Sequence, residues 1–385
     1  MVKVFSHDPF VGFVIKLETT WGTDPGTWGS AAYKVPFTSE DLHLDTEVFA
    51  ISEEFGALGG NLGVETGRQS VTGSITVEPT YNTTWWWTLF SQVWGTENLV
   101  NDRSIWDDVA AVTNLNTHIW TPGTGLPIGM SSRVWLGGQG PAGSSYFKLI
   151  TGLIITRMVW NQPRNGRATV TFDFIGKALT APLGTGETIP ALASSTKVKA
   201  IDFTAVGSRT HGSIMIGTTL ASFNTMGFTL TVDRKVELSD NYLQTLTTTD
   251  KPGIVGTREV TLEIDTDLEQ DFGAAGKPFA DFLSQTVTSV AISYDSGVTA
   301  VSPEEYNFSF QIPSLLWTDV RPQAANVGAF AMPLTGTAQM GALANLDAPF
   351  NEHTIPTSIF DIRALCHVVG TDDGDAKYST LANAT

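Results

Sequence analysis

The fold is decided by the stretch Gly67-Arg-Gln-Ser-Val-Thr-Gly-Ser-Ile-Thr-Val-Glu-Pro79 and by the segment Trp85-Trp-Trp-Thr-Leu-Phe-Ser-Gln-Val-Trp-Gly95, which follows it after a polar turn. In the first segment, Val71, Ile75 and Val77 alternate with polar residues. This period of two is typical of a strand with one buried and one solvated face. The proline at the end of the segment stops the strand.

The second segment has the spacing of a helix. Trp86, Leu89, Phe90 and Val93 recur at the i, i+3, i+4 and i+7 positions of one helix face, and Gly95 can end the helix. Consecutive helical residues point about 100° apart, so the three adjacent tryptophans cannot form one platform for stacking on a sugar. Packing in a core or interface is therefore favoured, with sugar binding as the alternative.

A diverged copy of this stretch begins at Gly256 and keeps the order of strand, loop and helix. Val71 and Ile75 return as Val260 and Ile264 at a constant spacing, and the apolar helix face returns after a slightly longer loop. We expect both helices to pack on a core through Trp86, Leu89, Phe90, Phe279, Phe282 and Leu283.

Two further blocks extend the match in the same order. Upstream, Leu42, Leu44, Asp45 and Val48 match Leu230, Val232, Asp233 and Val236. Downstream, Tyr146 matches Tyr306, and Phe174, Gly176 and Ala178 match Leu334, Gly336 and Ala338. Four blocks in one order favour an internal duplication over coincidence.

The sequence therefore predicts a mainly β fold of two tandem β-sandwich domains, each with one short α-helix. A chain of 385 residues is too long for one ordinary core. We expect a first domain over residues 1–183, with an N-terminal arm and an insertion at about 96–130. A second domain covers residues 184–341, and a C-terminal extension covers 342–385, whose apolar residues are expected to dock on a neighbour.

Composition limits the partners. The net charge of −17 is that of a surface that repels nucleic acid, although plain solubility is the alternative reading. The single cysteine, Cys366, excludes an intramolecular disulfide and suits synthesis in a reducing cytoplasm. No stretch has the length and apolarity of a signal peptide or a membrane anchor.

No constellation in the sequence indicates catalysis, a cofactor or a metal. The six histidines are scattered without the spacing of zinc ligands. The glycine pattern from Gly138 to Gly143 is followed by strand-like alternation, whereas a dinucleotide site needs a helix there. Asp372-Asp373-Gly374-Asp375 lacks the spacing of a calcium loop and reads as an acidic tail. We expect no enzymatic activity.

Two long links at matching places predict a contact surface, with disorder as the alternative. The link from Glu53 to Gly67 is rich in glycine, and the link from Ser239 to Gly256 is as long. The candidate contact residues are Gly56, Gly59, Gly60, Gly63, Thr247 and Asp250.

The order of these elements resembles the tail tube proteins of long-tailed bacteriophages. The segments that carry the resemblance are Glu18-Thr19-Thr20-Trp21-Gly22-Thr23, Gly73-Ser74-Ile75-Thr76-Val77-Glu78 and the final Leu334-Thr-Gly-Thr-Ala338. The resemblance implies tail-tube-type β-sandwich domains, six of which form a ring, and rings that stack through loops and arms into a tube that carries double-stranded DNA.

With two such domains in one chain, it further implies trimeric, pseudo-hexameric rings of a virion protein made in the host cytoplasm. The tape measure and other tail proteins would be its partners, and it would need no cofactor. Two alternatives remain open: another tail ring component, such as a terminator or baseplate ring, and a carbohydrate-binding β-sandwich adhesin.

Overall fold

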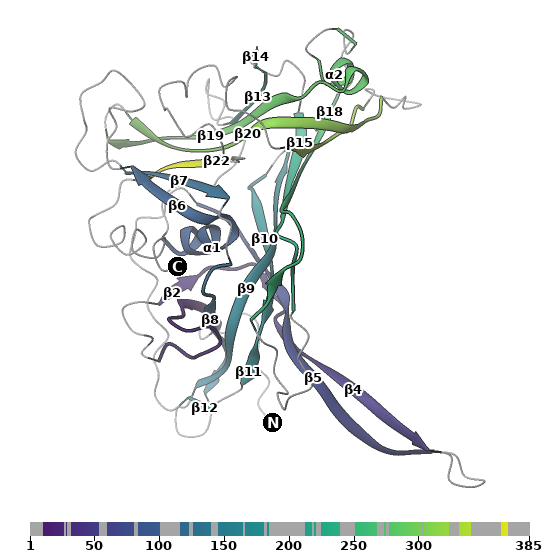
Figure 1. Ribbon diagram of the computed structural model, residues 1–385. Coiled ribbons are helices and arrows are strands. Elements are labelled where there is room, and N and C mark those ends of the chain that lie inside the picture. The colour runs from purple at the N-terminus through teal and green to yellow at the C-terminus, as the bar shows by residue number, and fades with distance from the viewer. Residues whose placement is uncertain are drawn as a thin grey trace.

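Long antiparallel strands dominate the computed structural model, and two short helices accompany them (Figure 1). The structure describes residues 11–26, 28, 32–53, 60–80, 84–100, 116–122, 126–139, 145–164, 166–180, 183–184, 212–217, 219–220, 225–238, 251–267, 273–274, 277–301, 304–322, 331–339 and 363–368.

The elements fall into two successive sets along the chain. The first set contains β1 (Val11–Leu17), β2 (Tyr33–Val35), β3 (Ser39–Glu40), β4 (His43–Glu53), β5 (Gly60–Val77), α1 (Thr84–Trp94), β6 (Gly95–Val100), β7 (Asn116–Pro122), β8 (Met130–Gln139), β9 (Ser145–Pro163), β10 (Thr169–Gly176), β11 (Ala178–Thr180) and β12 (Leu183–Gly184). The second contains β13 (Gly212–Ile216), β14 (Thr219–Leu220), β15 (Thr225–Asp233), β16 (Val236–Glu237), β17 (Gly253–Ile254), β18 (Glu259–Thr266), α2 (Pro278–Ser284), β19 (Thr288–Val301), β20 (Glu304–Val320), β21 (Leu334–Ala338) and β22 (Arg363–Val368).

One antiparallel sheet continues from the first set of strands into the second. Its order is β4, β5, β10, β9, β15, β18, β21 and β20, with β3 in line with β4 on the same edge of β5. The link between the halves is the β9–β15 ladder, which runs from Pro163 opposite Gly227 to Arg157 opposite Asp233. We call these eight strands, together with β3, the main sheet.

The halves pair their strands in the same order. In the first half the order is β1, β8, β9, β10, β5 and β4; in the second it is β13, β19, β20, β21, β18 and β15. Along the chain, helix α1 falls between β5 and β8, and α2 falls between β18 and β19. In space, α1 packs on β9 and α2 packs on β20. The β6–β7 hairpin, absent from the second half's described residues, falls in the predicted insertion.

Both ladders are irregular at matching points. Thr156 is the extra residue where the β9–β10 register shifts after Asp173, and Thr318 is the extra residue where the β20–β21 register shifts. The β8–β9 and β19–β20 ladders also share a shift, between Met130 and Ser132 in one and between Thr288 and Val290 in the other. Such bulges bend a strand and increase its twist, so both halves bend alike.

One hydrophobic core spans both halves. Trp160 of β9 donates a hydrogen bond from Nε1 to the Tyr294 hydroxyl at 2.9 Å, and its ring stacks on Phe308 with 5.2 Å between centroids. Phe90 of α1 contacts Phe308 edge-on at 6.0 Å. All four side chains are fully buried in a single cluster. The proposed domain limits at residues 183 and 184 therefore do not separate two independent cores, and they stay a prediction.

The strand registers correct part of the internal alignment. Ile75 lies opposite Phe172, and Ile264 lies opposite Leu334. Leu334 thus corresponds to Phe172, two residues from the Phe174 that the sequence match chose, and the Tyr146 match to Tyr306 is shifted equally. A shift of two residues preserves the inward and outward alternation of a strand, so the apolar pattern could not detect it.

The predicted N-terminal arm is partly wrong, because residues 11–17 form a core strand. β1 pairs with β2 and β8, and Phe13, Val14 and Ile15 are all fully buried. A strand buried on both faces shows no alternation of apolar and polar residues, which is why no period of two indicated a strand there. Residues 1–10 lie outside the described residues.

The C-terminal extension also returns to its own chain. β22 lies between β20 and β7, with Leu365 opposite Ser309 on one side and Ile119 on the other. The expectation that this apolar segment docks on a neighbour is therefore wrong for the part that the structure describes. β22 joins the insertion of the first half to the sheet of the second.

Candidate assembly surfaces

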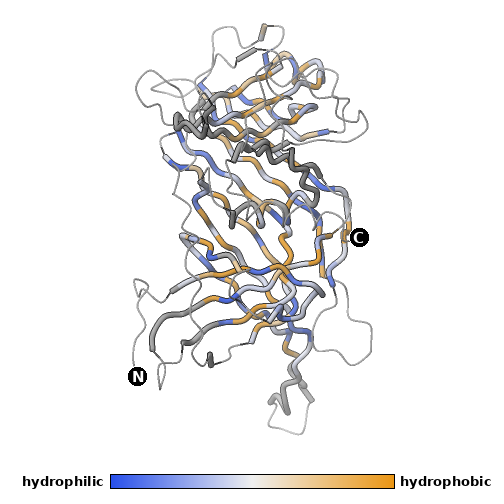
Figure 2. Tube along the Cα trace, turned by 90° about the vertical axis from the view of Figure 1, so that its left-hand side faces the viewer, coloured by the Kyte–Doolittle hydropathy of each residue, from blue (hydrophilic) through white to orange (hydrophobic). Residues whose placement is uncertain are grey.

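Hydrophobic and hydrophilic residues alternate along the strands of the main sheet (Figure 2). The buried residues of each strand lie on one face, so the main sheet has one apolar face and one polar face. A row of opposed residues on the apolar face is buried under the helices and smaller strands: Ile75, Phe172, Met158, Val232 and Val260. The neighbouring row on the other face runs Ser39, Thr76, Thr171, Val159, Thr231, Thr261 and Thr337. The polar face is thus a continuous surface that crosses both halves of the chain.

Charged groups on this polar face are mostly acidic, and its cations are paired. Arg157 Nε lies 3.5 Å from Asp173 Oδ2, and Arg321 Nη2 lies 2.7 Å from Asp319 Oδ2. Lys235, at the end of β15, donates to Asp233 at 2.8 Å. Burial is the main cause that raises the pKa of Asp173, whereas Arg157 lowers it. Phosphate binding needs clustered cations, and these cations already have carboxylate partners.

Among the residues that the structure describes, the main sheet ends in two edges that no further strand covers. At one end, β3 and β4 pair with β5, and the described residues contain no strand on their outer side. At the other end, β20 from Trp317 to Val320 pairs with β21 on one side, and no described strand pairs with its other side, because β19 leaves β20 at Leu315. An open strand edge presents unpaired N–H and C=O groups and is a template for pairing with another chain.

The β4–β5 hairpin projects from the rest of the molecule (Figure 1). Val48 and Phe49 on β4 are 58% and 53% exposed. A Cβ on Gly67 would meet the Phe49 ring at 2.5 Å, so the glycine leaves room for the ring across the ladder. Val48 and Phe49 point to opposite faces of the strand, so the projecting hairpin exposes apolar surface on both of its sides. Exposed apolar surface at a projecting site favours a contact with another molecule.

The structure corrects the predicted loop in the first half. The segment from Glu53 to Gly67 is largely strand, since β4 ends at Glu53 and β5 begins at Gly60. Gly60 and Gly63 thus lie in the ladder, opposite Glu53 and Ile51. Glycine is depleted in strands, which is why the composition suggested a loop. Gly56, Gly59, Thr247 and Asp250 lie outside the described residues.

The predicted helix residues take different positions. Leu89 and Phe90 are fully buried, and Phe279 and Phe282 are half-buried against the core. Leu283 is 66% exposed, so its expected burial is wrong. α2 is shorter than α1 and ends at Ser284, so its apolar face is narrower than the alignment with α1 implied. The side chain of Trp86 lies outside the described part of the structure.

The segment from Glu18 to Thr23, which carries part of the resemblance noted in the sequence, forms a structural corner. Glu18, almost fully buried, accepts hydrogen bonds from Gly22 N at 2.5 Å, Ser131 Oγ at 2.5 Å and Gly152 N at 2.7 Å. Trp21 Nε1 donates to the Gly152 carbonyl at 3.0 Å. Gly152 has φ +71° at the β9 bulge, so these contacts fix the bulge.

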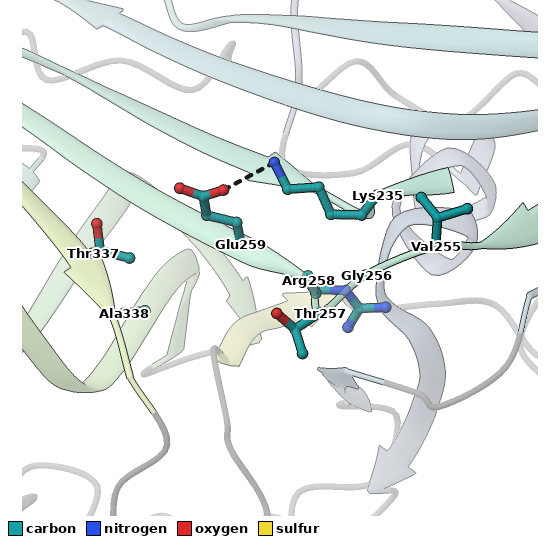
Figure 3. Close-up of a pocket in the computed structure, with 8 residues that line it drawn as sticks. All are labelled: Lys235, Val255, Gly256, Thr257, Arg258, Glu259, Thr337 and Ala338. Atoms are coloured by element: carbon teal, nitrogen blue, oxygen red, sulfur yellow. Dashed lines mark ion pairs between the residues drawn. The ribbon is translucent and has the colours of Figure 1, made fainter. Parts of the chain in front are cut away.

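A pocket of about 410 Å³ lies where β18 begins (Figure 3). Lys235 reaches over it and pairs with Glu259 at 2.9 Å. Burial lowers the pKa of Arg258, which also lines the pocket, to about 10. The ion pair occupies the lysine, and we assign this pocket no ligand.

The described residues contain no group of three or more His, Cys, Asp or Glu side chains placed to hold a metal ion. Neither described helix is long and apolar enough to cross a membrane.

Two comparisons with known proteins bear on the identity of the chain. No curated protein matches the chain. A family model described as phage tail tube protein matches residues 11–302, which include both helices and most strands of the main sheet. This match covers well over half of the chain, and the chain therefore belongs to the phage tail tube protein family.

Proposed function

We propose that this chain is a structural, non-enzymatic subunit of a phage tail tube that assembles with itself into stacked rings. The observation that carries the proposal is the main sheet, which crosses both halves and stops at an open edge at each end. Closing such a sheet around a ring removes both edges at once. Family membership supports the same role.

The shared pairing order supports an internal duplication in which each half is one ring position. A ring of three chains would then present six similar positions. Heterologous contacts between identical chains form closed rings when the rotation between neighbours closes. The three-chain ring is the stoichiometry that we propose on this basis.

We further propose that the polar face lines the lumen through which double-stranded DNA passes. Its threonine row and its paired cations offer DNA few unpaired positive charges. The opposite face is covered by α1, α2 and the smaller strands, so it cannot face an open channel. Other tail proteins, the tape measure among them, would be partners in the virion.

Negative-stain microscopy of the purified chain tests this function. We expect rings or tubes, and we expect the chain to be among the abundant proteins of purified virions. A chain that stays monomeric at every concentration would contradict the proposal. A copy number of only a few per virion would instead favour a terminator or baseplate ring.

A further inference from the structure

The β9–β15 ladder inside the chain defines how the two open edges can meet between chains. β9 corresponds to β20 and β15 corresponds to β3 and β4, by pairing order and by register. β15 covers one edge of β9, and the equivalent edge of β20 is open. β15 pairs with β9 through one of its own edges, and the equivalent edge of β4 is open.

We propose that β4 of one chain pairs antiparallel with the end of β20 of the next chain, in the register of the β9–β15 ladder. This inference rests on the proposed function and names the contact within the ring. The internal β9–β15 ladder contains the pairs Asp233–Arg157, Val232–Met158 and Thr231–Val159. Replacing each residue by its counterpart in the other half gives the pairs between chains. They are Asp45 with Asp319, Leu44 with Val320, and His43 with Arg321.

Burial along the two edges fits this register. Val320 is buried and Leu44 is half-buried against the core, and their counterparts Met158 and Val232 are fully buried at the internal junction. Pairing would place Leu44 and Val320 on the same face, so one apolar row would continue into the neighbour. A slip of one residue would instead turn these side chains to the polar face.

A hydrogen bond inside the chain shows how the end of the ladder between chains would be formed. Arg234 N donates to the Thr156 carbonyl at 2.9 Å, just beyond the last β9–β15 pair. The corresponding contact between chains joins Thr46 N to the Thr318 carbonyl. In the other direction Pro322 has no N–H group, so the ladder between chains weakens there. The junction is therefore centred on residues 43–46 of one chain and 318–321 of the next.

Charges across this junction are complementary along the diagonals. Within one chain His43 Nε2 lies 3.4 Å from Asp45, and Arg321 is held by Asp319. The register sets Arg321 diagonal to Asp45 and His43 diagonal to Asp319, and diagonal neighbours lie within reach of long side chains. Each carboxylate thus gains a cationic neighbour from the other chain along the diagonal when His43 is protonated. The directly opposed pairs carry like charges, Asp45 with Asp319 and His43 with Arg321, which opposes the pairing. The register is therefore supported by the apolar row and the main-chain correspondence, and the charges do not select it.

Disulfide trapping tests the register in a Cys366→Ser background. Directly opposed residues of an antiparallel pair have Cα atoms about 4.5–5.5 Å apart, a separation that a disulfide spans. We would prepare H43C/R321C and, as a second in-register pair, D45C/D319C, both at exposed positions. After oxidation with copper phenanthroline, we expect loss of the monomer band on a non-reducing gel and a ladder that ends at the closed ring.

Three controls separate register from chance collision. The single variants H43C and R321C should form no disulfide-linked dimer, because head-to-tail contact never brings one edge against itself. The pair H43C/D319C is two residues out of register and should be trapped far less. T231C/V159C should close within one chain without changing its size, because those residues are opposed in the internal ladder.

The outcomes distinguish this inference from the function on which it rests. Rings on the grid with efficient trapping of H43C/D319C, but of neither in-register pair, would overturn the register and leave the tube function intact. Absence of any assembly in the unmodified chain would overturn both. A ladder from the in-register pairs that continues beyond a closed ring would overturn ring closure by this contact.

Discussion

Thr156 and Thr318 occupy equivalent bulges in the two halves of the chain, and their side chains make equivalent hydrogen bonds. Thr156 Oγ1 donates to the Asp173 carbonyl at 3.2 Å, and Thr318 Oγ1 donates to the Thr335 carbonyl at 3.2 Å. Each threonine lies where the strand bends away from one neighbour and toward the next. The bend of β9 makes room for β15, so the bend of β20 leaves an equivalent place, which no described strand fills.

The two bulge threonines should therefore have similar energetic roles. Thr156→Val and Thr318→Val each remove one hydrogen bond, and we expect each to lower the free energy of unfolding by about 0.5–1.5 kcal/mol. Urea denaturation measures this change. Thr261→Val, on the same polar face, is the matched control and should have a smaller effect. A large effect at one bulge and none at the other would argue against their equivalence.

The helices should tolerate truncation unequally. Leu89→Ala opens a cavity in the core and should cost about 2–5 kcal/mol. Leu283→Ala removes an exposed side chain and should change stability by less than about 0.5 kcal/mol. Thermal unfolding of the two variants makes the comparison. Equal losses would mean that α2 is buried in solution.

Glu18 should be among the most sensitive positions of the chain. Glu18→Ala leaves the Gly22 and Gly152 amides and the Ser131 hydroxyl without their acceptor, and we expect a loss of about 3 kcal/mol or more. Glu263→Ala, an exposed carboxylate of the main sheet, serves as control in the same denaturation series. Similar stability of the two variants would contradict the structural role of the corner.

Stability should depend on pH through Asp173. Burial raises the pKa of this carboxyl, so the folded state binds its proton more tightly than the unfolded state does. Its contribution is fully present below the unfolded value of about 3.9 and is lost as pH rises through the raised folded value. Asp173→Asn should therefore gain stability relative to the unmodified chain as pH rises from about 4. Parallel unfolding curves for the two proteins across this range would refute the assignment.

The projecting hairpin should serve stacking rather than folding. Val48→Ser combined with Phe49→Ser removes exposed apolar surface, so circular dichroism should stay unchanged and single rings should still form. We expect tubes to shorten or disappear in micrographs. Val287→Ser, at an exposed apolar position that follows α2 and lies outside both predicted contact links, is the control. Tubes of normal length from the double variant would exclude the hairpin from ring contacts.

Much of the fold could be predicted because the apolar periods are local. The alternation around Ile75 and the helical spacing around Phe90 follow directly from which side chains are buried. The core strand at Phe13 was missed because both of its faces are buried. The extension of β5 back to Gly60 was missed because glycine is depleted in strands. These errors arise where tertiary contacts outweigh local preference.

The open edges could not be predicted from the pattern at all. Whether β4 has a neighbour depends on long-range pairing, and residues such as His43 and Arg321 carry no signal that joins them. Only the register of the internal β9–β15 ladder relates the two edges. The bulge at Thr156, which sets that register, changes the apolar alternation by a single residue.

A reconstruction of the assembled tube by electron cryomicroscopy tests the central claim most directly. We predict threefold rings with six similar positions, a lumen lined by the polar face around Thr171 and Thr231, and residues 43–45 of each chain beside residues 319–321 of the next. Rings in which each chain fills a single one of six positions, or tubes with that polar face on the outside, would contradict the account.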